Sequence, residues 1–249
     1  MEWTGEAIVL SARPHGETGA VLSLLTAGHG RHSGLMPGGR SARRRAALEP
    51  GSVVNVRWRA RLAEHLGTLT VEPLRQAAAV LLDDPLRLAG LVSMCAVAEA
   101  ALPEREPHPA VFRGCLALLD QLEGTDTHDG AAWGPAYVRW ELGLLGELGF
   151  GLDLSACAVS GVADELAYVS PRTGRAVSVA AGKPYADRLL RLPGFLVGRP
   201  GATVRDVLDG LALTGWFLER QAGVGLPAAR QRLVERFHIS TKSGSLDAS

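Results

Sequence analysis

The chain has 249 residues, 47% of them hydrophobic, and its 26 basic and 26 acidic residues cancel to a formal net charge of zero. This length suffices for one large or two modest domains with buried cores. No run of about 18 uninterrupted apolar residues predicts a membrane span, and the first residues lack the basic and apolar regions of a secretory signal. The three cysteines, Cys95, Cys115 and Cys157, are widely spaced, which favours reduced thiols over a disulfide framework.

The first eighty residues have the pattern of short strands separated by turns. We predict five strands, at 6–13, 18–26, 31–37, 52–62 and 66–72. Glycine-rich turns without an intervening long helix favour a small barrel. Five strands in a segment of this size are typical of an OB-fold, although other small barrels share the same strand count. We therefore predict an OB-fold domain at residues 1–80.

After this segment the apolar residues recur at helical spacing. Two aspartates before Pro85 are typical of a helix start. The apolar stripes, which are typical of packing surfaces, predict five helices: from 85 to 103, from 109 to about 122, and at 136–148, 204–220 and 228–237. The predicted fold class is thus α+β and multidomain, with a helical domain at residues 81–238.

Two stretches of this region depart from the helical pattern. Between residues 149 and 182 it lapses into turns, which predicts a small knuckle-like insertion at 153–182. The last residues, 239–249, are small and polar and are predicted to form a disordered tail.

The basic residues of the barrel segment are concentrated. Between residues 31 and 61 there are eight arginines and one acid, Glu49. Strand alternation places Trp58 on the core-facing side and Arg57, Arg59 and Arg61 on the other. A second cluster lies in a glycine-flanked loop upstream and contains Arg40, Arg43, Arg44 and Arg45. Guanidinium groups stay charged and bind phosphate with paired hydrogen bonds, so this asymmetry predicts a nucleic-acid-binding surface. The alternative is a solvated charged strand face.

We predict a DNA-binding surface that combines these arginines with nearby barrel residues. Its residues are Arg31, His32, Arg40, Arg43, Arg44, Arg45, Arg57, Arg59, Arg61 and His65. Because Trp3 is the only other tryptophan of the barrel besides Trp58, we expect contacts to the phosphate backbone, with little dependence on sequence and steep weakening by salt. No phosphate-binding loop, metalloprotease motif or hydrolase nucleophile motif occurs. We therefore predict no catalytic residue, no cofactor and no metal.

Several short motifs, in their order and spacing, are shared with a known family. They are Glu6-Ala7-Ile8-Val9-Leu10, Gly16-Glu17-Thr18, Gly30-Arg31-His32-Ser33-Gly34-Leu35, Gly38-Gly39-Arg40-Ser41, Leu48-Glu49-Pro50-Gly51, Tyr137-Val138-Arg139-Trp140-Glu141-Leu142 and Leu148-Gly149-Phe150-Gly151-Leu152-Asp153. On these residues the chain resembles the RecO family of bacterial DNA repair proteins, as far as about Phe237.

The resemblance implies an N-terminal OB-fold, a C-terminal helical domain and a non-enzymatic mediator role in the RecF pathway of recombination. It further implies binding of single- and double-stranded DNA and annealing of complementary strands. The implied partners are RecR and the C-terminal tail of single-strand-binding protein, with which such proteins load the recombinase. It implies a cytoplasmic, nucleoid-associated protein that does not bind membranes.

One departure from the family concerns zinc. Some members carry four cysteines in a zinc knuckle, whereas this chain has Cys157 at the first position and Ser160 at the second, and no cysteine between 170 and 177. Structural zinc requires four cysteine or histidine ligands. We therefore predict a knuckle that folds without metal, and stoichiometric zinc in the purified protein would contradict this.

Two other functions compete with the mediator role. The basic barrel could bind acidic protein partners as an interaction scaffold, which is compatible with DNA binding. An RNA-binding OB protein is the weaker alternative, because no feature of the sequence indicates recognition of a 2′-hydroxyl.

Overall fold

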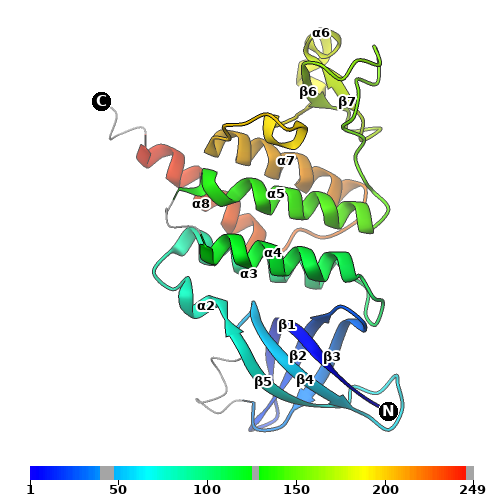
Figure 1. Ribbon diagram of the computed structural model, residues 1–249, viewed down its shortest axis with the longest axis vertical. Coiled ribbons are helices and arrows are strands. Elements are labelled where there is room, and N and C mark those ends of the chain that lie inside the picture. The colour runs from blue at the N-terminus through cyan, green and yellow to red at the C-terminus, as the bar shows by residue number, and fades with distance from the viewer. Residues whose placement is uncertain (40–47, 125–128, 245–249) are drawn as a thin grey trace. The chain divides into compact units, whose positions relative to one another are not determined.

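The computed structural model of the protein describes residues 1–39, 48–124 and 129–244 (Figure 1). Its contacts divide the chain into two compact units, Met1–Gly124 and Thr125–Ser249. Among the described residues, no helix is both long enough and apolar enough to cross a membrane.

The first unit contains a closed five-stranded barrel with the strand order β1-β2-β3-β5-β4. Its strands are β1 (Glu2–His15), β2 (Gly19–Thr26), β3 (Gly30–Met36), β4 (Ser52–Arg59) and β5 (Thr68–Gln76). Neighbouring strands are antiparallel except for β3 and β5, which pair in parallel. The predicted OB-fold barrel is confirmed.

Strand β4 has the alternation that the sequence predicts. Val54, Val56 and Trp58 are buried in the barrel core, whereas Arg57 and Arg59 are exposed. The strand ends at Arg59 rather than at the predicted residue 62. After Ala60, which exchanges two backbone hydrogen bonds with Met1, the chain turns. Arg61 and Leu62 therefore lie in the following loop, and Leu62, which strand alternation would place on the same face as Trp58, is 46% exposed.

Three helices follow the barrel within the first unit: α2 (Ala77–Val80), α3 (Pro85–Ala101) and α4 (Pro109–Gly124). Asp84 caps α3 by accepting hydrogen bonds from the N–H groups of Leu86 and Arg87, as predicted for this helix start. Arg75 of β5 forms salt bridges with Asp120 and Glu123 of α4. The chain changes from strand to helix at Ala77, before the predicted boundary at residue 80, and contacts group α3 and α4 with the barrel.

The second unit is built on three helices and a small sheet. The helices are α5 (Gly130–Glu147), α7 (Val204–Arg220) and α8 (Ala228–Gly244). The sheet has the order β7-β6-β8 and consists of β6 (Leu166–Val169), β7 (Ala176–Ser178) and β8 (Leu190–Arg191). Short turns of helix complete it: α6 (Val179–Gly182), η2 (Lys183–Arg188) and η3 (Gly194–Val197).

Helix α7 has the predicted bounds, whereas α5 and α8 each differ from the prediction by more than one turn at one end. Asp129 caps α5 by accepting from the N–H of Ala131, so the helix begins six residues before the predicted start and contains Pro135. Helix α8 continues to Gly244, although residues 239–249 were predicted to be a disordered tail. Burial of Phe237 and Leu233 anchors the preceding turns of α8, and residues 245–249 lie outside the described part of the chain.

A buried ion pair connects the three helices of the second unit. The Arg230 guanidinium of α8 donates from Nε and Nη2 to the two carboxylate oxygens of Glu141 on α5, at 2.7 and 2.8 Å. Arg230 also donates to the carbonyl of Leu211, and the hydroxyl of Thr214 donates to Glu141. Both ends of the pair are almost fully buried. Both carboxylate oxygens of Glu141, and the Nε and Nη2 of Arg230, thus have hydrogen-bond partners, which a buried ion pair requires.

Candidate nucleic-acid interface

The outer face of β4 carries both signs of charge. Cross-strand register places Glu2 of β1 opposite Arg59, and both Glu6 of β1 and Glu72 of β5 opposite Asn55. Arg57 forms a salt bridge with Glu2, and this bridge lowers the pKa of the Glu2 carboxyl. The strand face that is predicted to carry Arg57, Arg59 and Arg61 is therefore flanked by carboxylates along most of its length.

Two arginines at the end of β4 and just after it have side chains without such a salt bridge. Arg59 and Arg61 are exposed, and neither side chain forms a hydrogen bond or salt bridge with another residue in the described ranges. Together with His65 they line a groove of 780 Å³ that we call the rim groove. Its remaining lining residues are Met1, Leu35, Ala60, Leu66, Gly67 and Thr68. The structure thus brings Arg59, Arg61 and His65 together, as a phosphate-binding surface requires.

The loop of the rim groove is held by the barrel core. The indole Nε1 of Trp58 donates to the carbonyl of Leu66 at 2.9 Å. Gly67 then has a positive φ of 68°, and a Cβ there would lie 2.4 Å from that same indole nitrogen. Only glycine fits this close approach, so Trp58 and Gly67 together position the loop that carries Arg61 and His65.

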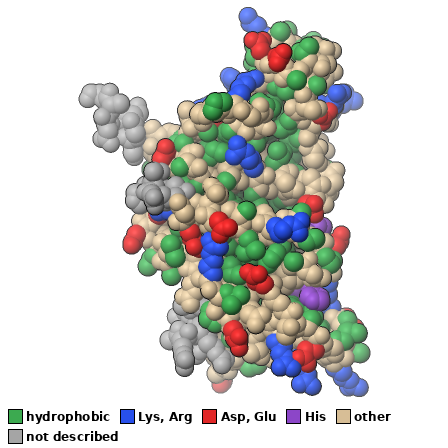
Figure 2. Space-filling model, viewed as in Figure 1, with side chains coloured by type: hydrophobic (Ala, Val, Ile, Leu, Met, Phe, Trp, Pro, Cys, Tyr) green, Lys and Arg blue, Asp and Glu red, His purple; other side chains and the backbone are tan. Residues whose placement is uncertain are grey.

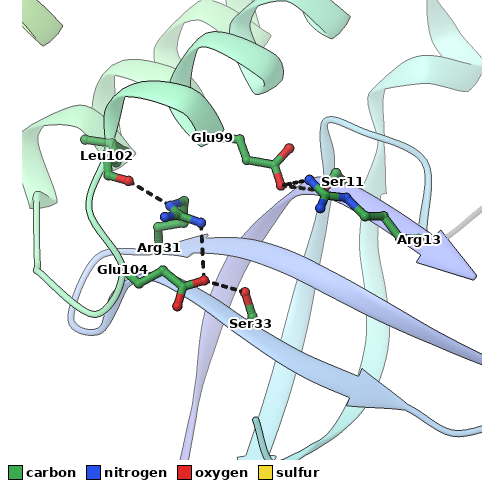
Figure 3. Close-up of polar contacts among 7 residues, drawn as sticks. All are labelled: Ser11, Arg13, Arg31, Ser33, Glu99, Leu102 and Glu104. Atoms are coloured by element: carbon green, nitrogen blue, oxygen red, sulfur yellow. Dashed lines mark hydrogen bonds and ion pairs between the residues drawn. The ribbon is translucent and has the colours of Figure 1, made fainter. Parts of the chain in front are cut away.

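Arg31, unlike Arg59 and Arg61, is occupied by contacts within the protein (Figure 3). Its Nε donates to the carbonyl of Leu102 at 2.7 Å, and its Nη1 lies 3.3 Å from a carboxylate oxygen of Glu104. Ser33 donates to the same carboxylate, and only 20% of the Arg31 side chain is exposed. Arg31 therefore fastens the segment after α3 to β3, and its donors are directed at protein rather than at solvent.

His32 is the site prediction that the structure corrects. The residue is 5% exposed and lies inside the barrel, with its ring in edge contact with Trp3 and Trp58. Burial, with a smaller contribution from the positive charge of Arg105, lowers the pKa of His32 to about 4. Alternation along β3 turns His32 toward the core and Arg31 away from it. A buried, neutral imidazole is not a surface phosphate contact.

The remaining predicted residues fall in the glycine-flanked loop: Arg40, Arg43, Arg44 and Arg45 lie outside the described residues. On the face shown in Figure 2, basic and acidic side chains are interspersed. The rim groove is therefore the best-defined candidate surface of the barrel.

Arg105 is a basic residue near the barrel that the sequence reasoning missed. Its Nη2 donates to the carbonyls of Glu64 and His65. Its backbone N–H donates to the backbone carbonyl of Arg31 at 2.7 Å. The segment at residues 105–106 can lie this close to β3 only because residue 30 is glycine: a Cβ there would lie 1.9 Å from the carbonyl oxygen of Glu106. No local sequence pattern connects Arg105 with the loop at residue 65; only the packing of this segment against β3 does so.

The sulfur of Cys157 in the insertion of the second unit has serine neighbours. Burial raises the pKa of the Cys157 thiol, but hydrogen bonds from Ser160 and Ser178 outweigh burial and lower it to about 6. The backbone N–H of Ser178 donates to the sulfur at 3.3 Å. Within the described ranges no three histidine, cysteine or acidic side chains are grouped to hold a metal. One thiol with serine neighbours does not match the four-ligand set of structural zinc.

Comparison with known proteins identifies the family. Residues 1–77 match the family model "Recombination protein O N terminal", and residues 82–230 match "Recombination protein O C terminal". The chain is 59% identical to the DNA repair protein RecO of Rhodospirillum centenum, over 98% of both chains. It is 56% identical to the protein of that name from Rhodospirillum rubrum, over 95% of this chain and 96% of the relative, and 50% identical to that of Caulobacter vibrioides, over 97% and 100%. The chain therefore belongs to the RecO family of DNA repair and recombination proteins.

Proposed function

We propose that the protein is a non-enzymatic recombination mediator that binds single- and double-stranded DNA with the rim groove of its barrel. The observation that carries the proposal is the exposed pair Arg59 and Arg61 beside His65, in a groove without a competing salt bridge among the described residues. Arg40, Arg43, Arg44 and Arg45, which lie outside the described residues, remain predicted contacts to DNA. Arg31 and His32 are not part of the rim groove, because Arg31 is paired with Leu102 and Glu104 and His32 does not line the groove.

Strand annealing follows from the same chemistry. Two complementary strands repel each other through their phosphates, and a basic groove that neutralises some of these charges lowers that repulsion. No covalent bond has to change, so the proposal needs no catalytic residue. In the cell, at the nucleoid, the protein would act with RecR and with the acidic tail of single-strand-binding protein to load the recombinase.

Removing the rim charges is expected to weaken DNA binding through its salt dependence. In the double variant Arg59→Ala/Arg61→Ala, loss of two phosphate contacts should reduce the slope of log affinity against log salt by about 1.4 for a single strand. Titration of a fluorescent single-stranded oligonucleotide at several salt concentrations measures this slope. Strand-annealing rates of the two proteins provide a second readout.

Arg57→Ala is the matched control, since Arg57 lies on the same strand face but is paired with Glu2. Arg57→Ala should change the salt slope much less than the double variant Arg59→Ala/Arg61→Ala does. An unchanged slope in the triple variant Arg57→Ala/Arg59→Ala/Arg61→Ala would refute the barrel-face interface. Competition by an acidic peptide, but not by DNA, would instead favour the protein-interaction scaffold.

A further inference from the structure

A second cavity adjoins the rim groove and is lined by aromatic and imidazole rings. It has a volume of 480 Å³ and shares Met1 with the rim groove. Its rings come from strands that are distant in sequence: Trp3 of β1, His32 of β3, Trp58 of β4, and His29 from the turn before β3. Arg105, Ala63, Glu2 and Gly28 complete the lining. We call this cavity the ring pocket.

The ring nitrogens Nδ1 and Nε2 of His32, which lines the ring pocket, have no hydrogen-bond partners among the described residues. The residue is 95% removed from solvent. Unsatisfied buried polar atoms are costly and uncommon, and these two nitrogens belong to a residue that lines a cavity, so they are available to a hydrogen-bonding group that enters it. A neutral imidazole offers one N–H donor and one nitrogen acceptor. That combination suits the edge of a nucleobase, which also presents donors and acceptors, better than it suits an anion.

The other rings provide stacking surface. His29 is exposed and stacks on Trp3, with ring centroids 4.3 Å apart and planes 18° from parallel. Trp58 lies parallel behind Trp3 at 6.0 Å. Flat ring surfaces of this kind bind bases by stacking, with little dependence on base identity.

We propose that the ring pocket binds a single unpaired nucleobase of a strand whose phosphates lie in the rim groove. The inference rests on the proposed DNA-binding function, and it adds a contact to a base to the contacts with phosphates. His32 would bond the edge of the base, the Trp3–His29 pair would stack on it, and Arg105 would contact the adjoining phosphate. Because a base within a duplex is stacked and paired, the pocket would favour single strands over double strands.

The test compares two oligonucleotides that differ only in their bases. One is a twelve-residue oligothymidylate, and the other has the same length and charge but carries abasic sugars. We expect the full-length protein to bind the thymidylate about tenfold more tightly than the abasic strand, as stacking of one base would produce. The salt slopes of the two strands should be equal, because the phosphates are the same.

Two substitutions then locate the preference. His29→Ala removes an exposed ring, and His32→Leu removes the base-bonding nitrogens; each should bring the affinity ratio close to one without changing the salt slope. His15→Ala is the matched control, since His15 is an exposed histidine at the opposite end of β1 from Trp3. If His32→Leu fails to fold, the exposed His29 still decides the question.

The possible failures are distinguishable. If neither strand binds, the proposed DNA-binding function itself is wrong. If both strands bind equally well and lose affinity in Arg59→Ala/Arg61→Ala, DNA binding stands and the ring pocket is refuted. A thymidylate preference that persists in both His29→Ala and His32→Leu would also refute it.

Discussion

Arg230→Met is expected to reduce the free energy of unfolding by about 3–5 kcal/mol, which is typical when one partner of a buried ion pair is removed. Glu141 is fully buried, and Arg230 supplies two hydrogen bonds to its carboxylate. Methionine fills part of the volume but leaves the Glu141 carboxylate with only the hydroxyl of Thr214 as a hydrogen-bond donor among the described contacts. The uncompensated charge, rather than the lost attraction, is the main cost.

Denaturant unfolding followed by circular dichroism measures this effect. Arg232→Met is the matched control, because Arg232 is exposed and lies two residues further along α8. The double variant Glu141→Leu/Arg230→Met should recover much of the lost stability, since it leaves no buried charge and Thr214 still donates to Gly210. Equal stabilities of Arg230→Met and Arg232→Met would contradict the role assigned to the pair.

Acidification is expected to destabilise the barrel through His32. Burial, together with the charges of Arg105 and His29, lowers the pKa of this imidazole to about 4, and Glu104 opposes the shift only weakly. In the unfolded chain the same group has its ordinary pKa of 6.5. Between these two values the unfolded state binds a proton that the folded state excludes. Stability therefore falls as the pH drops from about 6.5 towards 4, by about 3 kcal/mol in total.

The comparison of two variants isolates this contribution from that of the carboxylates. Wild-type protein and His32→Leu are unfolded with denaturant at pH 7 and pH 4.5, and the loss of stability between the two values is compared. His32→Leu should lose about 2–3 kcal/mol less than wild type, whereas His15→Ala, which removes an exposed histidine, should behave like wild type. A loss of the same size in all three proteins would show that His32 is not held neutral.

Local patterns were sufficient to predict most elements of the fold. Alternation in β4 placed Trp58 in the core, and the structure confirms it. The apolar stripe of α7 predicted both of its ends, and Asp84 marked the start of α3. These signals depend on neighbours within a few residues along the chain. Where helix ends depend on other contacts, as in α5 and α8, the predicted bounds were less accurate.

The candidate site was predicted only in outline, because charge depends on which strands lie side by side. Alternation showed that Arg57 and Arg59 share a face, but only the pairing of β1 with β4 brings Glu2 to them. Likewise, Arg31 is in a basic stretch of sequence, yet the segment after α3 occupies its guanidinium with Glu104. Neither carboxylate lies near its arginine in the sequence.

The sequence by itself determined the five-stranded barrel, the helical region and, through its motifs, the resemblance to a repair family that the comparisons confirm. Only the tertiary structure decided which basic groups are accessible, and only it brought Trp3, His29, His32 and Trp58 into one pocket. The physical reason is that strand periodicity is a local property of the chain. The closure of a barrel, by contrast, joins residues more than fifty positions apart, and the burial and charge of each side chain depend on those partners.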